Sequence, residues 1–340
     1  MIRAVTVINT SSLNKDAITM KLDGLRNGPF TLWKIDGIGP GKADINITEA
    51  ASTDGGSFNS ARQNSREITL TLVLNWYDGS IEAARHYSYQ FFPLKKKVRL
   101  IIYSTENLKQ SPNIVKNPTS ARYIDGYVMQ NEPEIFSSLC AVEVVLKCPD
   151  PYFYACSPNL IDSPSINPES IEEYKTYTMG SEISSFYFPF SNLENSLNFG
   201  GSIPNDIIDI PYPLYASETG CYFIFKISRS LEDSYPKIII QNTRTNSEFK
   251  LDFSFLRNYA DFSNGLQIGD KIIISSIPGS KDVVILRGGY YTSIIGVIEY
   301  DSIWPVLYPG ENLYRCYSQD NLYEIGIEVS ARYKEKYGGV

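Results

Sequence analysis

The sequence is poor in the residues on which most enzymes depend for acid–base and metal chemistry. It contains one histidine, His86, among 340 residues. A histidine-based catalytic triad would have to use this residue, and no Cys/His metal cluster can be built around it. No GxSxG nucleophile motif is present either. These absences disfavour a hydrolase and predict a protein that is not an enzyme and has no cofactor, no catalytic residue and no bound metal.

Paired cysteines, excess positive charge and long apolar runs are also missing. The formal net charge is −7, which argues against binding of duplex nucleic acid, because phosphate binding needs clustered Lys and Arg. No apolar run reaches about 18 residues, so no membrane insertion is expected. The odd number of cysteines, the absence of a CxxC pair and the lack of an N-terminal signal peptide predict free thiols in a reducing cytoplasm. The cysteines are Cys140, Cys148, Cys156, Cys221 and Cys316.

Three local patterns lack the spacing that their chemistry needs. The glycine-rich loop 37–41 has no GxxxxGK[ST] motif, and the residues after it alternate as in a strand instead of opening a helix. Asp206 and Asp209 lack the regular ligand spacing of a known calcium loop. Acids close in sequence, such as Glu132 and Glu134, say nothing about the facing pair of a glycosidase, and we interpret them as turn or surface acids.

The residues that form β-strands dominate what is present. The chain is 43% hydrophobic and 13% aromatic, with 25 Tyr and 16 Phe, which indicates an ordered, mainly β protein. The clearest strand is 66–74, where positions 68, 70, 72 and 74 are Ile or Leu and the opposite face is mostly polar. That alternation is typical of a strand half buried in an antiparallel sheet. The strand 140–148 is expected to direct Cys140 and Cys148 into the core.

One helix is expected in the first half. Ser80 is a suitable N-cap, Glu82 is favourable in the first turn, and Pro93 ends the helix. His86 would lie on its surface.

The length predicts two domains, because single cores tend to stop growing beyond roughly 250 to 300 residues. Pro149 and Pro151 interrupt strand pairing, so we place a first domain at 1–154. A linker or extended segment, rich in Ser, Pro, Asn and Glu, follows at 155–183. Short strands separated by Asn, Gly and Pro turns then predict an antiparallel β-sandwich at 184–340, with Phe249 to Phe255 alternating on one face.

Two polar segments, 50–65 and 104–120, are too long for ordinary connections in a compact domain. We interpret them as arms that bridge to a neighbouring subunit. The candidate oligomer-interface residues are Asp54, Gly55, Gly56, Arg62 and Arg66.

Six fragments of the first half occur in a recognisable order: 33–39 (WKIDGIG), 54–57 (DGGS), 65–68 (SREI), 84–85 (AR), 124–128 (IDGYV) and 148–153 (CPDPYF). In this order the half resembles the distal tail proteins of long-tailed bacteriophages, the hub ring proteins of the baseplate. The resemblance implies a tail-tube-like β-sandwich or barrel with one helix, assembling into a sixfold ring at the tip of the tail tube.

The second half resembles the same family at 266–272 (LQIGDKI), 300–312 (YDSIWPVLYPGEN) and 331–340 (ARYKEKYGGV). There the resemblance implies a galectin-like sandwich. No family pattern covers 157–215. Four aromatic residues could pack on sugar rings in a groove of this sandwich: Tyr290, Tyr291, Trp304 and Tyr308. Trp304 followed by proline is also typical of a core plug between sheets.

The resemblance implies a structural virion protein, assembled in the host cytoplasm, that joins the tail tube to the tip. Its expected partners are copies of itself in a hexameric ring, the tail tube protein, a tail tip or tail-associated protein, and receptor-binding or peripheral baseplate proteins. DNA would pass through the ring without specific binding. The context could be a siphophage or a contractile tail. The alternative hypothesis is a carbohydrate-binding module that contacts the host cell surface.

Overall fold

The computed structural model describes residues 2–10, 16–21, 28–49, 54–105, 119–133, 140–158, 173–179, 186–187, 198–199, 206–229, 231, 235–259, 262, 264–318, 322 and 326–340. The chain divides into two compact units, which are described separately. Unit 1 comprises residues 1–173 together with 336–340, and unit 2 comprises residues 174–335. The chain therefore leaves unit 1 once and returns to it with its last five residues.

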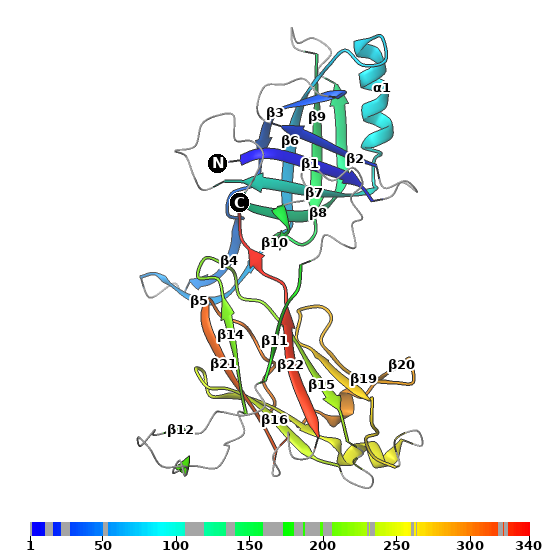
Figure 1. The fold of residues 1–340 in the computed structure, drawn as a ribbon. Helices are drawn as coiled ribbons and strands as arrows, with labels where there is room; N and C mark the ends of the chain where they lie inside the picture. Colours follow the sequence, from blue (N-terminus) through cyan, green and yellow to red (C-terminus); the bar gives the residue numbers. More distant parts are fainter. Residues whose placement is uncertain are drawn as a thin grey trace. The chain divides into compact units, whose positions relative to one another are not determined.

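Unit 1 is built on one antiparallel sheet with the strand order β2-β1-β7-β8-β9-β6-β3 (Figure 1). Its edge strands β2 and β3 contact each other, so the sheet curls towards closure, in agreement with the expected barrel-like fold. The strands are β1 (Ile2–Asn9), β2 (Ala17–Lys21), β3 (Phe30–Asp36), β6 (Arg66–Leu74), β7 (Lys97–Ser104), β8 (Ser120–Pro133), β9 (Ala141–Cys148), β10 (Phe153–Cys156) and β23 (Lys336–Tyr337).

The predicted alternation is confirmed in the centre of this sheet. In β6 the residues Ile68, Leu70 and Leu72 are fully buried between more exposed neighbours. Gly126 of β8 lies where a Cβ atom would be 2.9 Å from the Cys148 sulfur, so the glycine permits the close approach that its place inside a strand indicates.

The helix α1 (Ile81–Phe91) forms where it was predicted. The Ser80 side chain accepts a hydrogen bond from the backbone N–H of Ala83 at 2.9 Å, and the helix ends ahead of Pro93. Ala84 and Phe91 are buried, and the helix contacts β6 and β8.

A separate hairpin extends from unit 1, made of β4 (Ala43–Glu49) and β5 (Gly56–Gln63). The strand at 43–49 was predicted, whereas residues 50–65 were interpreted as a polar arm to which no strand was assigned. Gly, Ser and Asn have low strand propensity, and the backbone hydrogen bonds to β4 override it here. In the other expected arm, 104–120, residues 106–118 lie outside the described residues.

Unit 2 is an antiparallel sandwich of a larger and a smaller sheet, so the expectation of a mainly β protein is confirmed. Phe223 packs against Tyr314 with ring centroids 5.2 Å apart, and Tyr212 packs against Tyr333 at 5.4 Å, which joins the two sheets. The larger sheet has the order β11 (Lys175–Thr178), β22 (Ile327–Tyr333), β15 (Tyr222–Ile227), β18 (Lys271–Ser275), β19 (Asp282–Arg287) and β20 (Tyr290–Ser293). The smaller sheet has the order β14 (Ile207–Tyr212), β21 (Gly310–Tyr317), β16 (Lys237–Asn242) and β17 (Ser247–Asp252), and β12 (Phe186–Tyr187) pairs with β13 (Asn198–Phe199) apart from both.

Two side chains differ from their predicted orientation. Cys140 is exposed while Cys148 is buried, because β9 begins only at Ala141. Phe255 is 49% exposed, because β17 ends at Asp252 and a 3-10 helix over 253–258 follows, whose period of about three residues breaks the alternation.

The first unit also extends past residue 154, where we expected it to end. Pro149 and Pro151 lack an N–H group, but pairing resumes directly after them: β10 pairs with β8 and with β23. Phe153 of β10 is fully buried. Residues 336–340, expected in the second domain, belong to unit 1, and 175–178 of the expected linker form β11 in unit 2.

Candidate functional site

The hairpin β4–β5 has one apolar and one polar face. Ile45 pairs with Ala61 and Ile47 pairs with Phe58, and directly paired residues of antiparallel strands share a face. Of these apolar residues, Ile45, Ile47 and Phe58 are 52% to 66% exposed. On the other face Asp44 and Arg62 form an ion pair of 3.7 Å. A two-stranded ribbon is marginally stable alone, so this one needs a partner for its apolar face.

The tip of the hairpin contains three of the predicted interface residues. Asp54 is exposed, and Gly55 has a positive φ of 87° in open space. Gly56 is required for a different reason, since a Cβ atom there would lie 2.4 Å from a methyl carbon of Ile47. Arg62 is exposed in the stem of β5.

Arg66 differs from the other four, because it is buried and bonded within its own chain. Its Nε donates to the carbonyl of Pro151 at 2.8 Å, and its Nη1 donates to the carbonyls of Gly37, at 2.8 Å, and Gly39. Its Nη2 donates to the carbonyl of Gly338. Burial lowers the pKa of this guanidinium, and the carbonyl oxygens around it compensate for the lost water. The side chain thus fixes the loop that leads into the hairpin.

The last five residues close the same loop from the other side. The Arg122 guanidinium stacks over the ring of Tyr337 at 3.8 Å and donates to the carbonyl of Gly339 at 2.7 Å. The backbone N–H of Val340 donates to the carbonyl of Ile38 at 3.1 Å. A Cβ atom on Gly339 would lie 3.1 Å from the loop backbone, so this contact is a close one. The hairpin root therefore depends on residues of the first half of the chain and on the last five residues.

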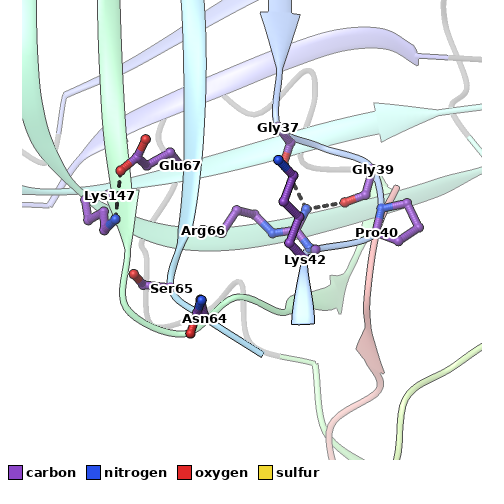
Figure 2. Close-up of a pocket in the computed structure, with 10 residues that line it drawn as sticks. Gly37, Gly39, Pro40, Lys42, Asn64, Ser65, Arg66, Glu67 and Lys147 are labelled. Atoms are coloured by element: carbon purple, nitrogen blue, oxygen red, sulfur yellow. Dashed lines mark hydrogen bonds and ion pairs between the residues drawn. The ribbon is translucent and has the colours of Figure 1, made fainter. Parts of the chain in front are cut away.

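A cavity of about 630 Å³ opens at the hairpin root (Figure 2). Glycine and proline backbone forms one wall, and the charged side chains are Lys42, Arg66, Lys147 and Glu67. Glu67 is occupied by Lys147, with Nζ and Oε1 2.7 Å apart. Three cations against one carboxylate make this cavity electropositive in a protein whose formal charge is −7.

The sequence patterns did not identify this cavity. The glycines of the loop 37–41 were the one feature that could have indicated it, but we compared them only with the phosphate-binding loop motif, which they do not match. The cations come from the residue before β4, from β6 and from β9, and sequence spacing does not show that these positions meet.

The four predicted glycan residues do not form one aromatic platform. Tyr290 and Tyr291 of β20 are 81% and 69% exposed, and Tyr291 lines a cavity of about 600 Å³ over the larger sheet of unit 2. Trp304 is half-buried instead and packs on Phe249 at 4.7 Å between ring centroids. Tyr308 is half-buried, with its backbone N–H donating to the side-chain oxygen of Asn312.

Within the described ranges, no group of three or more His, Cys, Asp or Glu residues could hold a metal ion. Asp206, considered above for calcium, pairs with Arg315. His86 is exposed on α1, 3.4 Å from Glu82. Among the described helices, none is long and apolar enough to cross a membrane.

Comparison with known proteins gives matches at the level of structure. No protein-family model and no curated protein sequence matches the chain. The crystal structure of the Dit protein of phage SPP1, a paradigm of the hub adsorption apparatus in phages that infect Gram-positive bacteria, matches with a TM-score of 0.54 and 12% identity. The match covers 98% of this chain and 99% of that one.

Two structures of the phage P2 baseplate in its activated conformation, with calcium and with strontium, give TM-scores of 0.46 and 0.42 at 11% and 10% identity. Each covers 99% of this chain and 98% of the other. The resemblance expected from the sequence fragments is confirmed in the SPP1 match, which spans both units and leaves no large part of either chain unmatched. This protein has the fold of the phage hub protein Dit.

Proposed function

We propose that this protein is a structural component of a phage tail tip, a hub ring that connects the tail tube to the tip. The observation that carries the proposal is the likeness to the SPP1 hub protein over 98% of the chain, which includes both units. The protein would be a virion component assembled in the host cytoplasm. In this reading unit 1 forms the ring, and the sandwich docks receptor-binding or peripheral baseplate proteins.

The hairpin β4–β5 supports assembly into a ring. A ring of identical chains closes through a heterologous interface, in which one surface of each copy contacts a different surface of the next. An exposed apolar ribbon that leaves the sheet is suited to such a contact, because burying Ile45, Ile47 and Phe58 removes apolar surface from water. Six copies, the number implied by the family resemblance, would carry the hairpin into six equivalent interfaces.

The net charge is compatible with a duct for DNA. Six copies carry a formal charge of −42, which is six times −7. Phosphate groups are bound by clustered cations, so an acidic ring lets DNA pass without holding it.

The test is the mass of the purified protein by light scattering at several concentrations and two salt concentrations. We expect a hexamer or a dimer of hexamers, and we expect Ile47→Ser on the apolar face to give monomers. Asn46→Ser on the opposite face of the same strand is the matched control and should keep the ring. A monomer under all conditions, or equal effects of the two variants, would contradict a ring held by this face.

Carbohydrate binding is a second candidate function, favoured by the cavity over the larger sheet of unit 2. Tyr291 lines it beside half-buried aliphatic side chains and the polar groups of Lys226, Lys271 and Glu328. Screening the full-length protein and its Tyr291→Ala variant on a glycan array tests this candidate. Sugar binding that disappears in the variant would support this candidate. Absence of sugar binding by the unchanged protein would contradict it.

A further inference from the structure

The hairpin β4–β5 carries unmatched charges of opposite sign at its two ends. Lys42 precedes β4 at the root and lines the electropositive cavity, and it has no ion-pair partner within the described residues. At the tip, Glu49 and Asp54 are exposed and likewise without an ion-pair partner in the described ranges. Some acids of unit 1 are matched instead, since Glu67, Glu82 and Asp125 each have a basic partner within 3 Å.

We propose that the cavity at the hairpin root receives the acidic hairpin tip of a neighbouring copy of this chain, with the Asp54 carboxylate against Lys42. The inference rests on the proposed ring and names the surface that each arm contacts. An element that is positive at one end and negative at the other complements a second copy of itself head to tail, which is the arrangement that a heterologous ring requires.

The dimensions of the hairpin fit this arrangement. The seven residues of β4 separate root from tip by about 23 Å, at about 3.3 Å per residue. In a ring of six, the distance between neighbouring equivalent points equals the radius of the circle on which they lie. An arm that reaches from its own root to the next root therefore places the cavities on a circle of about 23 Å radius.

The cavity is also large enough to admit an acidic side chain. Its volume of about 630 Å³ exceeds the space that one carboxylate needs. The guanidinium of Arg66 adds positive charge while its donors are occupied by carbonyls, and Lys147 is paired with Glu67, so Lys42 is the group left to meet an incoming carboxylate.

A disulfide between root and tip tests the contact directly. We would place Lys42→Cys and Asp54→Cys in a Cys140→Ser background, in which the four remaining native cysteines are buried. Within one chain the two positions lie at opposite ends of the ribbon, whereas a disulfide needs Cα atoms about 4.4 to 6.8 Å apart. A bond can therefore form only between copies. On oxidation we expect a non-reducing gel to show multiples of the chain mass that end at the closed ring.

Control variants separate this contact from general proximity. Lys96→Cys with Asp54→Cys, which pairs the tip with an exposed lysine outside the cavity, should give no ladder. Lys42→Glu and Asp54→Lys should each raise the protein concentration of half-assembly about fivefold or more, and the double exchange should restore it.

The outcomes distinguish this inference from the proposed ring. If the wild type assembles and Ile47→Ser disrupts it, but the variant with both Lys42→Cys and Asp54→Cys gives no ladder, the tip does not reach the neighbouring cavity and the ring stands. If the wild type is monomeric and no ladder forms, both proposals fail. A ladder of equal strength in the Lys96→Cys control would also overturn the root-to-tip contact.

Discussion

At the scale of single residues, Gly37 and Gly55 share a left-handed backbone but have different surroundings. Gly37 has φ of 84°, and a Cβ atom there would lie 2.1 Å from the carbonyl oxygen of Glu67. Gly55 has φ of 87° and nothing within 4 Å. We expect Gly55→Ala to cost about 1 kcal/mol from backbone strain alone, and Gly37→Ala to cost more because β6 must move. Urea unfolding of both variants measures this, and equal losses would contradict it.

The pairing of Asp125 predicts a dependence of stability on acid. Burial tends to raise the pKa of this carboxyl, but hydrogen bonds from Arg99, at 2.6 and 2.8 Å, and from Lys97 hold it below its ordinary value. The folded state thus binds the proton less readily than the unfolded chain. The resulting stability is present above the ordinary Asp pKa of about 3.9 and is lost as the pH falls through the lower folded pKa.

We therefore expect Asp125→Asn to lower the free energy of unfolding by about 3 kcal/mol at pH 7, because Arg99 is left buried without its carboxylate. The difference from wild type should shrink below about pH 4. Urea unfolding at a series of pH values measures it. Glu67→Gln is the control, since its ion pair with Lys147 is exposed and should contribute less than about 1 kcal/mol. A constant difference at all pH values would refute the assignment.

At the scale of elements, the hairpin and the central strands of unit 1 should differ in protection from hydrogen exchange. Every described residue of β4 is exposed, whereas β6 lies between β9 and β3 in the sheet. In the Ile47→Ser variant, if monomeric, we expect hairpin amides to exchange close to the rate of an unfolded segment, while β6 stays protected. In the assembled wild type the hairpin should exchange at least about tenfold more slowly. Equal exchange in both proteins, measured by mass spectrometry, would show that the hairpin makes no contact on assembly.

Elements could be predicted from sequence where burial imposes a period. The alternation in β6 and β9 reports a buried face, and the Ser80 cap and Pro93 bound α1 through local chemistry. β5 was not predicted as a strand because its small polar residues are exposed and show no alternation between apolar and polar positions. β10 was not predicted because two prolines directly before it indicated that strand pairing ends there.

At the scale of the whole molecule, the last five residues are part of the folding unit formed by the first 173. Removing 336–340 takes away β23, the carbonyl that Arg66 Nη2 bonds and the ring on which Arg122 stacks. We expect the truncated chain to unfold in two steps, with unit 1 opening at lower urea concentration and unit 2 unchanged. Hydrogen exchange resolved along the chain assigns each step, and a parallel weakening of both units would contradict the prediction.

The candidate site could be predicted only where it is local. The hairpin tip is a contiguous stretch, so Asp54, Gly55 and Gly56 could be singled out from their turn chemistry. The hairpin root combines Lys42, Arg66 and Lys147 with the backbone carbonyl of Gly338. These residues are far apart in sequence, and the strand pairing that brings them together cannot be read from a single sequence. For the same reason Arg66 could not be recognised as an internal contact.

The return of the chain to unit 1 has a consequence during translation. The ribosome releases residue 336 more than 160 residues after residue 173, a delay of about 10 to 30 s at roughly 5 to 20 residues per second. Until then the sheet of unit 1 lacks β23, and Arg66 lacks one of its carbonyl partners. We expect the hairpin root of a nascent chain to remain incomplete over this interval. The order of synthesis would thereby delay completion of the hairpin root until unit 2 has been synthesised.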